Sequence, residues 1–161
     1  MRVFKTSFLV AAVLVTTTSN PVFAEGTNSM TNDQKDVLAL IQTMTRSFEK
    51  GDIDAVMATY EADQSIAFEP GSPVSDSAQS RQMFEQFRAL NPDFSYSGHE
   101  VIVEGDIAVH IAPWQMTGTD PEGNQVEGEG LSVAVLRRQA DGSWKMVIDN
   151  PYGNRLLTSA E

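Results

Sequence analysis

The chain has 161 residues, and its 22 acidic and 11 basic side chains give a formal net charge of −11 at pH 7. This surplus of negative charge repels phosphate backbones and anionic lipid head groups, which argues against nucleic-acid and membrane-surface partners. The sequence has no cysteine, which excludes disulfide bonds and the lipid-modified cysteine of a bacterial lipoprotein.

The first 24 residues have the pattern of a secretory signal peptide. Arg2 and Lys5 give a basic start, Phe8 to Val15 form a short apolar run, and Val22-Phe23-Ala24 offers small residues at a cleavage site. The apolar run is well short of the about 20 residues that a membrane span needs. We therefore expect a signal peptide over residues 1–24, a short tether over 25–30 and a periplasmic or secreted mature protein with no membrane attachment.

A helix is predicted from Thr31 to about Gly51. Thr31 and Gln34 form a capping-box pattern, in which each side chain can satisfy the other residue's free backbone N–H group. Apolar residues then recur at spacings of three and four, which is one face of a helix: Val37, Leu40, Ile41, Met44 and Phe48.

Two further helices and a short strand are predicted between Asp52 and Pro92. Asp52 can cap a second helix, whose apolar positions run from Ile53 to Tyr60. Residues 65–68 read as a short strand and residues 71–76 as a loop rich in Ser and Pro. Met83 to Leu90 then have the spacing of a third helix, which Asn91-Pro92 ends.

From Phe94 onward the apolar residues alternate with a period of two. The segments 101–103, 107–117, 131–138 and 144–148 are predicted strands, joined by turns that contain glycine. Helices followed by antiparallel strands indicate an α+β fold in a single domain.

Four segments carry a resemblance to a known superfamily. They are FEKGDIDAVMATYEAD at 48–63, FEPG at 68–71, VEGDIAVHIAPW at 103–114 and RRQADGSWKMVIDNPYG at 137–153. Together they resemble the NTF2-like superfamily in its SnoaL-like or DUF4440 branch. The resemblance covers Thr31 to Gly153, and we take residues 31–155 as the domain and 156–161 as a C-terminal tail.

The resemblance implies a cone in which three N-terminal helices pack on a curved antiparallel sheet and enclose a pocket. Members are frequently homodimers that associate through the sheet. Ketosteroid isomerases share this shape and use an aspartate base with a tyrosine and a protonated aspartate. Here Met44 and Ala134 stand at the last two positions, so that machinery is not expected, although Glu69 stands where the base would be.

Three ionisable residues are candidate acid/base groups: Glu69, His110 and Asp149. Glu69 would have a raised pKa if it faced an apolar cavity; the alternative is a solvated residue beside a turn, as most glutamates are. His110 shares one face of its strand with Ala108, and the opposite face, which carries Ile107, could equally be the buried one. Asp149 could lie at the rim of the pocket or simply form a turn before Pro151.

Aromatic and polar residues at core spacing are candidate ligand contacts, although the same pattern is typical of plain core: Tyr60, Phe68, Phe87, Trp114, Asn150 and Tyr152. Four methionines could add adaptable apolar surface: Met44, Met57, Met83 and Met116. With two histidines and no cysteine, neither a metal nor another cofactor is expected.

Three functions stay open at this stage. The first is binding of a small, largely apolar molecule in the cone. The second is a cofactor-independent isomerase, cyclase or hydratase, and the third is a structural or partner-binding homodimer with a filled cone.

Overall fold

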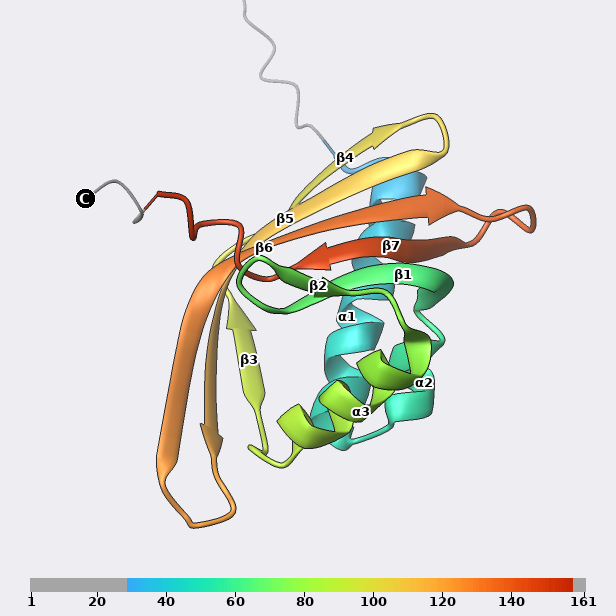
Figure 1. Ribbon diagram of the computed structural model, residues 1–161. Coiled ribbons are helices and arrows are strands. Elements are labelled where there is room, and N and C mark those ends of the chain that lie inside the picture. The colour runs from blue at the N-terminus through green and yellow to red at the C-terminus, as the bar shows by residue number, and fades with distance from the viewer. Residues whose placement is uncertain (1–28, 158–161) are drawn as a thin grey trace, which may run out of the picture.

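The computed structural model describes residues 29–157 (Figure 1). The predicted signal peptide and residues 25–28 of the predicted tether lie outside the described residues, as do residues 158–161. Three helices precede or interrupt the strands: α1 (Asn32–Lys50), α2 (Ile53–Met57) and α3 (Ser77–Arg88). The strands are β1 (Tyr60–Glu69), β2 (Ser72–Val74), β3 (Asp93–Tyr96), β4 (Glu100–Glu104), β5 (Ile107–Thr119), β6 (Gln125–Arg138) and β7 (Trp144–Asn150).

The start and the end of α1 follow from local chemistry, as predicted. The Thr31 side chain accepts a hydrogen bond from the backbone N–H group of Gln34, and the Gln34 side chain accepts one from the backbone N–H group of Thr31. Gly51 ends the helix with a φ of 77°, a left-handed conformation that a side chain would disfavour. Both signals that were read from the sequence are confirmed.

The second helix is shorter than its apolar pattern predicts. Asp52 caps it through the N–H group of Ala55, but the helix ends at Met57, and Tyr60 is the first residue of β1. The carbonyl of Thr59 accepts a hydrogen bond from the backbone of Met146 on β7. Pairing with a distant strand therefore overrides the helical spacing, which no local pattern could reveal.

The sheet is mixed rather than purely antiparallel. Its strand order is β2-β1-β7-β6-β5-β3, and β4 also pairs with β5. All neighbouring strands are antiparallel except β1 and β7, which are parallel. The predicted loop at 71–76 contains β2, which forms a hairpin with β1.

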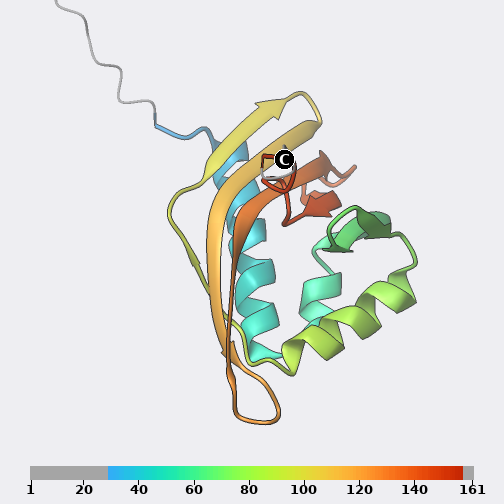
Figure 2. The same cartoon turned by 60° about the vertical axis from the view of Figure 1, so that its left-hand side comes forward.

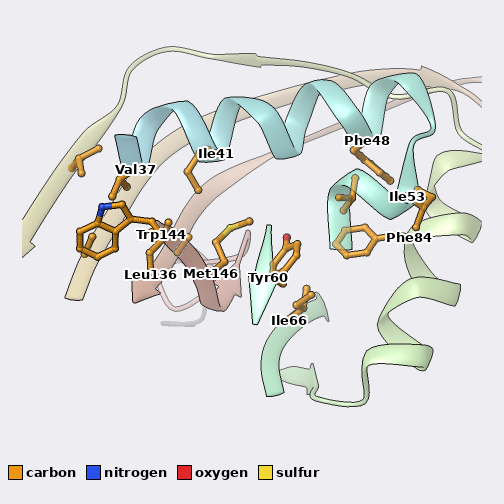
Figure 3. Packing of buried hydrophobic residues seen from close by; sticks show 14 residues of the cluster. Val37, Ile41, Phe48, Ile53, Tyr60, Ile66, Phe84, Leu136, Trp144 and Met146 are labelled. Carbon is orange, nitrogen blue, oxygen red and sulfur yellow. The ribbon is translucent and has the colours of Figure 1, made fainter. Parts of the chain in front are cut away.

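The sheet curves around α1, and α2 and α3 lie at its open side (Figures 1 and 2). The alternation along β5 settles which face is inward. Ala108, His110 and Ala112 are buried, whereas Ile107 is 41% exposed, so the face of His110 points toward α1. Figure 3 shows the core between them, with Val37 and Ile41 of α1 facing Leu136 and Met146 of the sheet.

Candidate functional site

A cavity of about 400 Å³ lies between α1, α3 and the inner face of the sheet. Most of its lining is apolar: Met44, Phe48, Ile66, Ala67, Phe68, Met83, Phe84, Phe87, Leu90, Phe94, Trp114 and Pro151. A smaller group of lining residues carries polar atoms: Thr45, Gln86, Tyr96, Ser132, Asp149 and Tyr152. An apolar hollow with a few convergent polar groups is typical of a small-molecule site.

The cavity exists because side-chain size changes along the inner face of β6. The inward positions run from Gly128 and Gly130 through Ser132 and Ala134 to Leu136. At the Leu136 end large side chains fill the space, whereas Ser132 leaves the sheet surface hollow above it. Alternate residues of one strand thus decide which end of the cone is solid and which end is open.

Aromatic rings form the wall opposite the sheet. The Phe48 ring lies 5.6 Å from that of Phe84 and 5.5 Å from that of Phe87, measured between centroids. Phe68 of β1 packs edge-on against Phe84 at 4.9 Å. These side chains come from α1, β1 and α3, so the wall depends on the whole fold and offers a ligand rigid apolar surface.

Asp149 is the one acidic side chain that lines the cavity. It is buried, and its Oδ2 accepts a hydrogen bond of 2.7 Å from the hydroxyl of Tyr60. Burial raises the pKa of Asp149 above its usual value, and the bond from Tyr60 opposes that rise only in part. The neutral acid is thereby favoured, and burial together with the neighbouring Asp149 also raises the pKa of Tyr60.

Tyr96, Trp114 and Tyr152 are held in fixed positions around the cavity. The Tyr96 hydroxyl lies 3.1 Å from that of Thr45, and Tyr152 donates a hydrogen bond of 2.8 Å to the carbonyl of Phe68. The indole N–H of Trp114 donates to the carbonyl of Pro151 at 2.9 Å. Burial raises the pKa of both tyrosines, so each keeps its proton as a donor.

His110 is fully buried but does not line the cavity. Its Nε2 lies 2.9 Å from Nδ1 of His99, and its own Nδ1 is buried with no hydrogen-bond partner. Burial first, and then repulsion from His99, lowers the pKa of His110 to about 4. The ring is therefore neutral at ordinary pH.

Comparison with known proteins places this fold in a family. The family model for the SnoaL-like domain matches residues 41–147. The chain belongs to the SnoaL-like domain family. A search of the curated proteins finds no match.

Several solved structures share the fold. One is described as a candidate dehydratase from the NTF2-like family of Streptomyces avermitilis, with 19% identity, a TM-score of 0.64 and coverage of 73% of this chain and 93% of that one. A candidate ketosteroid isomerase from Shewanella frigidimarina has 18% identity, a TM-score of 0.62 and coverage of 71% and 92%. The association domain of C. elegans CaMKII has 17% identity, a TM-score of 0.60 and coverage of 73% and 92%. At such identities the likeness shows the NTF2-like fold alone.

In this SnoaL-like domain, five of the predicted site residues line the cavity: Phe68, Phe87, Trp114, Asp149 and Tyr152. Tyr60 lies behind Asp149 and bonds to it. The side-chain oxygen of Asn150 accepts a hydrogen bond of 3.1 Å from the backbone N–H group of Tyr152. This is the contact of a turn residue and not of a ligand-binding one. Glu69 is exposed at the end of β1, where its charge contributes to the raised pKa of Tyr152.

Thr45, Tyr96 and Ser132 line the cavity and were missed at the level of sequence. Thr45 lies on the inward face of α1 among apolar residues, where a buried polar residue is itself a signal. Ser132 belongs to the run of small inward residues on β6. Tyr96 has no local signal, because it reaches the cavity through the pairing of β3 with β5.

Residues 29–157 offer no support for a metal site or for a membrane-spanning helix. No group of three side chains that could ligate a metal ion occurs in that range. No helix there is long and apolar enough to cross a membrane.

Proposed function

We propose that the protein is exported and binds a small, largely apolar molecule in the cavity of its cone. The observation that carries this proposal is the cavity of about 400 Å³, lined mainly by apolar side chains and floored by one buried acid. The basic start and the apolar run of residues 1–24 support export to the periplasm or the medium. The Asp-Gly-x-Trp turn at 141–144 supports a place near the DUF4440 branch.

The polar end of the ligand is a hydrogen-bond acceptor such as a carbonyl group. One oxygen of Asp149 accepts a hydrogen bond from the Tyr60 hydroxyl, and burial raises the pKa of Asp149, which favours the form of the carboxyl group that carries a proton. That proton is available to a ligand atom in the cavity. A cationic ligand would need the ionised carboxylate, which burial disfavours.

Fluorescence of N-phenyl-1-naphthylamine, a neutral apolar probe, tests binding directly. We expect saturable enhancement, and displacement by 1-acetylnaphthalene at a concentration about 2- to 10-fold lower than by 1-ethylnaphthalene, as one added hydrogen bond implies. Asp149→Leu should abolish that preference while the probe still binds. No saturable binding of the probe would contradict the cavity proposal, and equal displacement would contradict the role of Asp149.

Catalysis as an isomerase, cyclase or hydratase has weaker support in the geometry. Such a reaction needs a base and an acid that both reach the substrate. Of the three predicted groups only Asp149 lines the cavity, since His110 is sealed away from it and Glu69 is exposed. Binding is therefore the function that the arrangement favours.

A homodimer is a second proposal, and the outer face of the sheet supports it. Ile102, Val109, Val135 and Ile148 form one row across β4, β5, β6 and β7. Ile102 is 51% exposed and Ile148 is 46% exposed, so this aliphatic row faces solvent in the single chain. A contiguous exposed apolar face is typical of an interaction surface.

Light scattering after size exclusion tests the dimer. The protein should elute with twice the mass of one chain, and Ile102→Glu should give the single-chain mass without loss of structure. As the control, Gln115→Glu alters an exposed residue outside the row and should leave the dimer intact. A single-chain mass for the unaltered protein at micromolar concentration would contradict this proposal.

A further inference from the structure

A second hollow lies beside the cavity and shares a wall with it. Its volume is about 320 Å³, and its lining includes Ser95, Ser97, Glu129 and Asn154, so it is more polar than the inner cavity. Tyr96 and Trp114 line both hollows. These two aromatic side chains therefore form a partition between the inner cavity and the outer hollow.

The two halves of the partition are held very differently. Trp114 is fixed through its N–H bond to Pro151, and it packs so closely on Gly130 that an added Cβ there would lie 3.0 Å from its ring. Tyr96 has one hydroxyl contact with Thr45, and its ring packs on the ring of His99 at 5.0 Å. Of the two side chains, Tyr96 is thus the one more easily displaced, and the His99 ring is one of its contacts.

His99 is held in turn by His110. The ring centroids lie 5.2 Å apart, which matches the 2.9 Å between the nitrogens plus the two ring radii. The nitrogens therefore point at each other, which is the geometry of an N–H···N hydrogen bond and not of two ligands converging on a metal ion. His99 is exposed and His110 is fully buried, so this bond ties a surface ring to the core.

The two neutral rings together carry two protons, one of which lies in the hydrogen bond between them. In the neutral pair, His110 can donate from Nε2 and leave its buried Nδ1 as a bare acceptor. A third proton, with the bond kept, would sit on Nδ1 of His110, which is buried and has no partner. An N–H group without an acceptor in the core is costly, so the protonated pair is relieved when His99 moves into solvent.

We propose that the His99–His110 bond is an acid-sensitive latch: acid releases His99, Tyr96 loses its support, and the partition between the two hollows opens. The device concerns access to the cavity and does not depend on the identity of the ligand. An exported protein meets external pH directly, which gives such a latch a physiological signal.

Few other ionisable groups face the pair. Glu100 follows His99 on β4, and Tyr96 is its neighbour from β3. Opposite His110, β6 presents Ala134, and the buried side chains of α1 carry no ionisable group: Val37, Ile41, Thr45 and Phe48. Asp149 and Glu49 act on Tyr96 through their charge, so the test must separate them from His99.

The test follows the ring signals of Tyr96 by NMR in the protein with ¹³C-labelled tyrosine, from pH 7.5 to pH 4.5, without any ligand. The sequence has three tyrosines, and Tyr60 and Tyr152 serve as internal references. In the unaltered protein the Tyr96 signals should move together with the imidazole signals of His99. Because no ligand is added, the result is independent of whether the cavity binds the naphthalene probe.

Two surface substitutions decide the cause. In His99→Gln the amide can still bond to His110 but cannot titrate, so the Tyr96 signals should keep their neutral-pH positions throughout. In His99→Ala they should already have their acid positions at pH 7.5. The latch is overturned if Tyr96 stays still while His99 titrates, or if it moves equally in His99→Gln, which would assign the change to Asp149 or Glu49.

Discussion

The two ends of the cone are built from the same strands but are filled differently. At one end Leu136, Trp144 and Met146 belong with Val37 to the buried hydrophobic core (Figure 3). At the other end Ser132, four residues earlier on β6, faces the cavity instead. The backbone is continuous between the two, so side-chain size alone separates a stabilising core from a space that can hold a ligand.

The same contrast applies to the buried ionisable groups. His110, Ala134 and Asp149 lie side by side in one cross-strand row on the inner face. Asp149 faces the cavity and bonds to Tyr60, whereas His110 is sealed beneath His99. Burial favours the neutral form of both, and this gives the two groups opposite effects on stability as pH changes.

The largest expected effect on stability comes from removing a large side chain from the well-packed end of the cone. Leu136 is fully buried, so Leu136→Ala should lower the free energy of unfolding by about 2–5 kcal/mol through lost burial and a new cavity. Met83 lines the existing cavity and is partly exposed, so Met83→Ala should lower the free energy of unfolding distinctly less than Leu136→Ala does. Urea denaturation of both variants checks this, and equal losses would mean that the two ends are packed alike.

The next effect is acid destabilisation through His110. Its pKa is about 4 in the folded protein against the ordinary 6.5, so the unfolded chain binds the extra proton between these values. Stability is therefore fully present above pH 6.5 and falls by about 3 kcal/mol as the pH drops toward 4. Denaturation of Asp149→Asn at a series of pH values checks this without the opposite contribution of Asp149, and a curve that is flat from pH 6.5 to 4.5 in this variant would contradict it.

A smaller effect is expected at the Asp149 end of the row. Tyr60→Phe removes the donor to the buried Oδ2 and should cost about 1–3 kcal/mol of unfolding free energy. The pKa of Asp149 should rise further in this variant, since the bond from Tyr60 lowers it. Carbon NMR of the aspartate carboxyl groups measures that shift, and a lowered pKa would show that the bond is not as described.

Asp149→Asn provides the comparison for that variant. Because the folded pKa of Asp149 is raised, its stabilising contribution is complete at pH below the unfolded value of 3.8 and is lost as pH rises through the folded value. Asparagine avoids that loss, so the variant should gain stability relative to the unaltered protein at pH 7 and lose this advantage in acid. A variant that is less stable at pH 7 would contradict the raised pKa of the buried Asp149.

Local signals predicted much of the fold. The capping box at Thr31, the cap at Asp52 and the alternation from residue 101 onward each depend on a few neighbouring residues, and the structure confirms them. The errors at Tyr60 and in residues 71–76 have different causes. Tyr60 begins a strand because of a partner far away in the sequence, on β7. Residues 72–74 pair with the adjacent β1 in a short hairpin, a local partner that the prediction of a Ser- and Pro-rich loop did not include.

The site was less accessible from the sequence than the fold. Phe68 and Phe87 could be predicted as cavity-lining residues because they are aromatic. Tyr96 could not, because it reaches the cavity only through the pairing of β3 with β5. The inward direction of His110 could not be chosen, because both faces of its strand carry apolar residues. The decrease in side-chain size along β6 was visible in alternate residues, but it indicates a hollow only when the inward face is known.

The most direct test of the cavity is to fill it from one strand and leave the other face as a control. Ser132→Leu adds bulk inside the cavity, whereas Val133→Leu places the same leucine side chain at the neighbouring residue on the outer face. The affinity for N-phenyl-1-naphthylamine should fall at least 10-fold in Ser132→Leu and stay unchanged in Val133→Leu, with both proteins folded by circular dichroism. Undiminished binding in Ser132→Leu would show that the probe does not occupy the cone and would contradict the central claim.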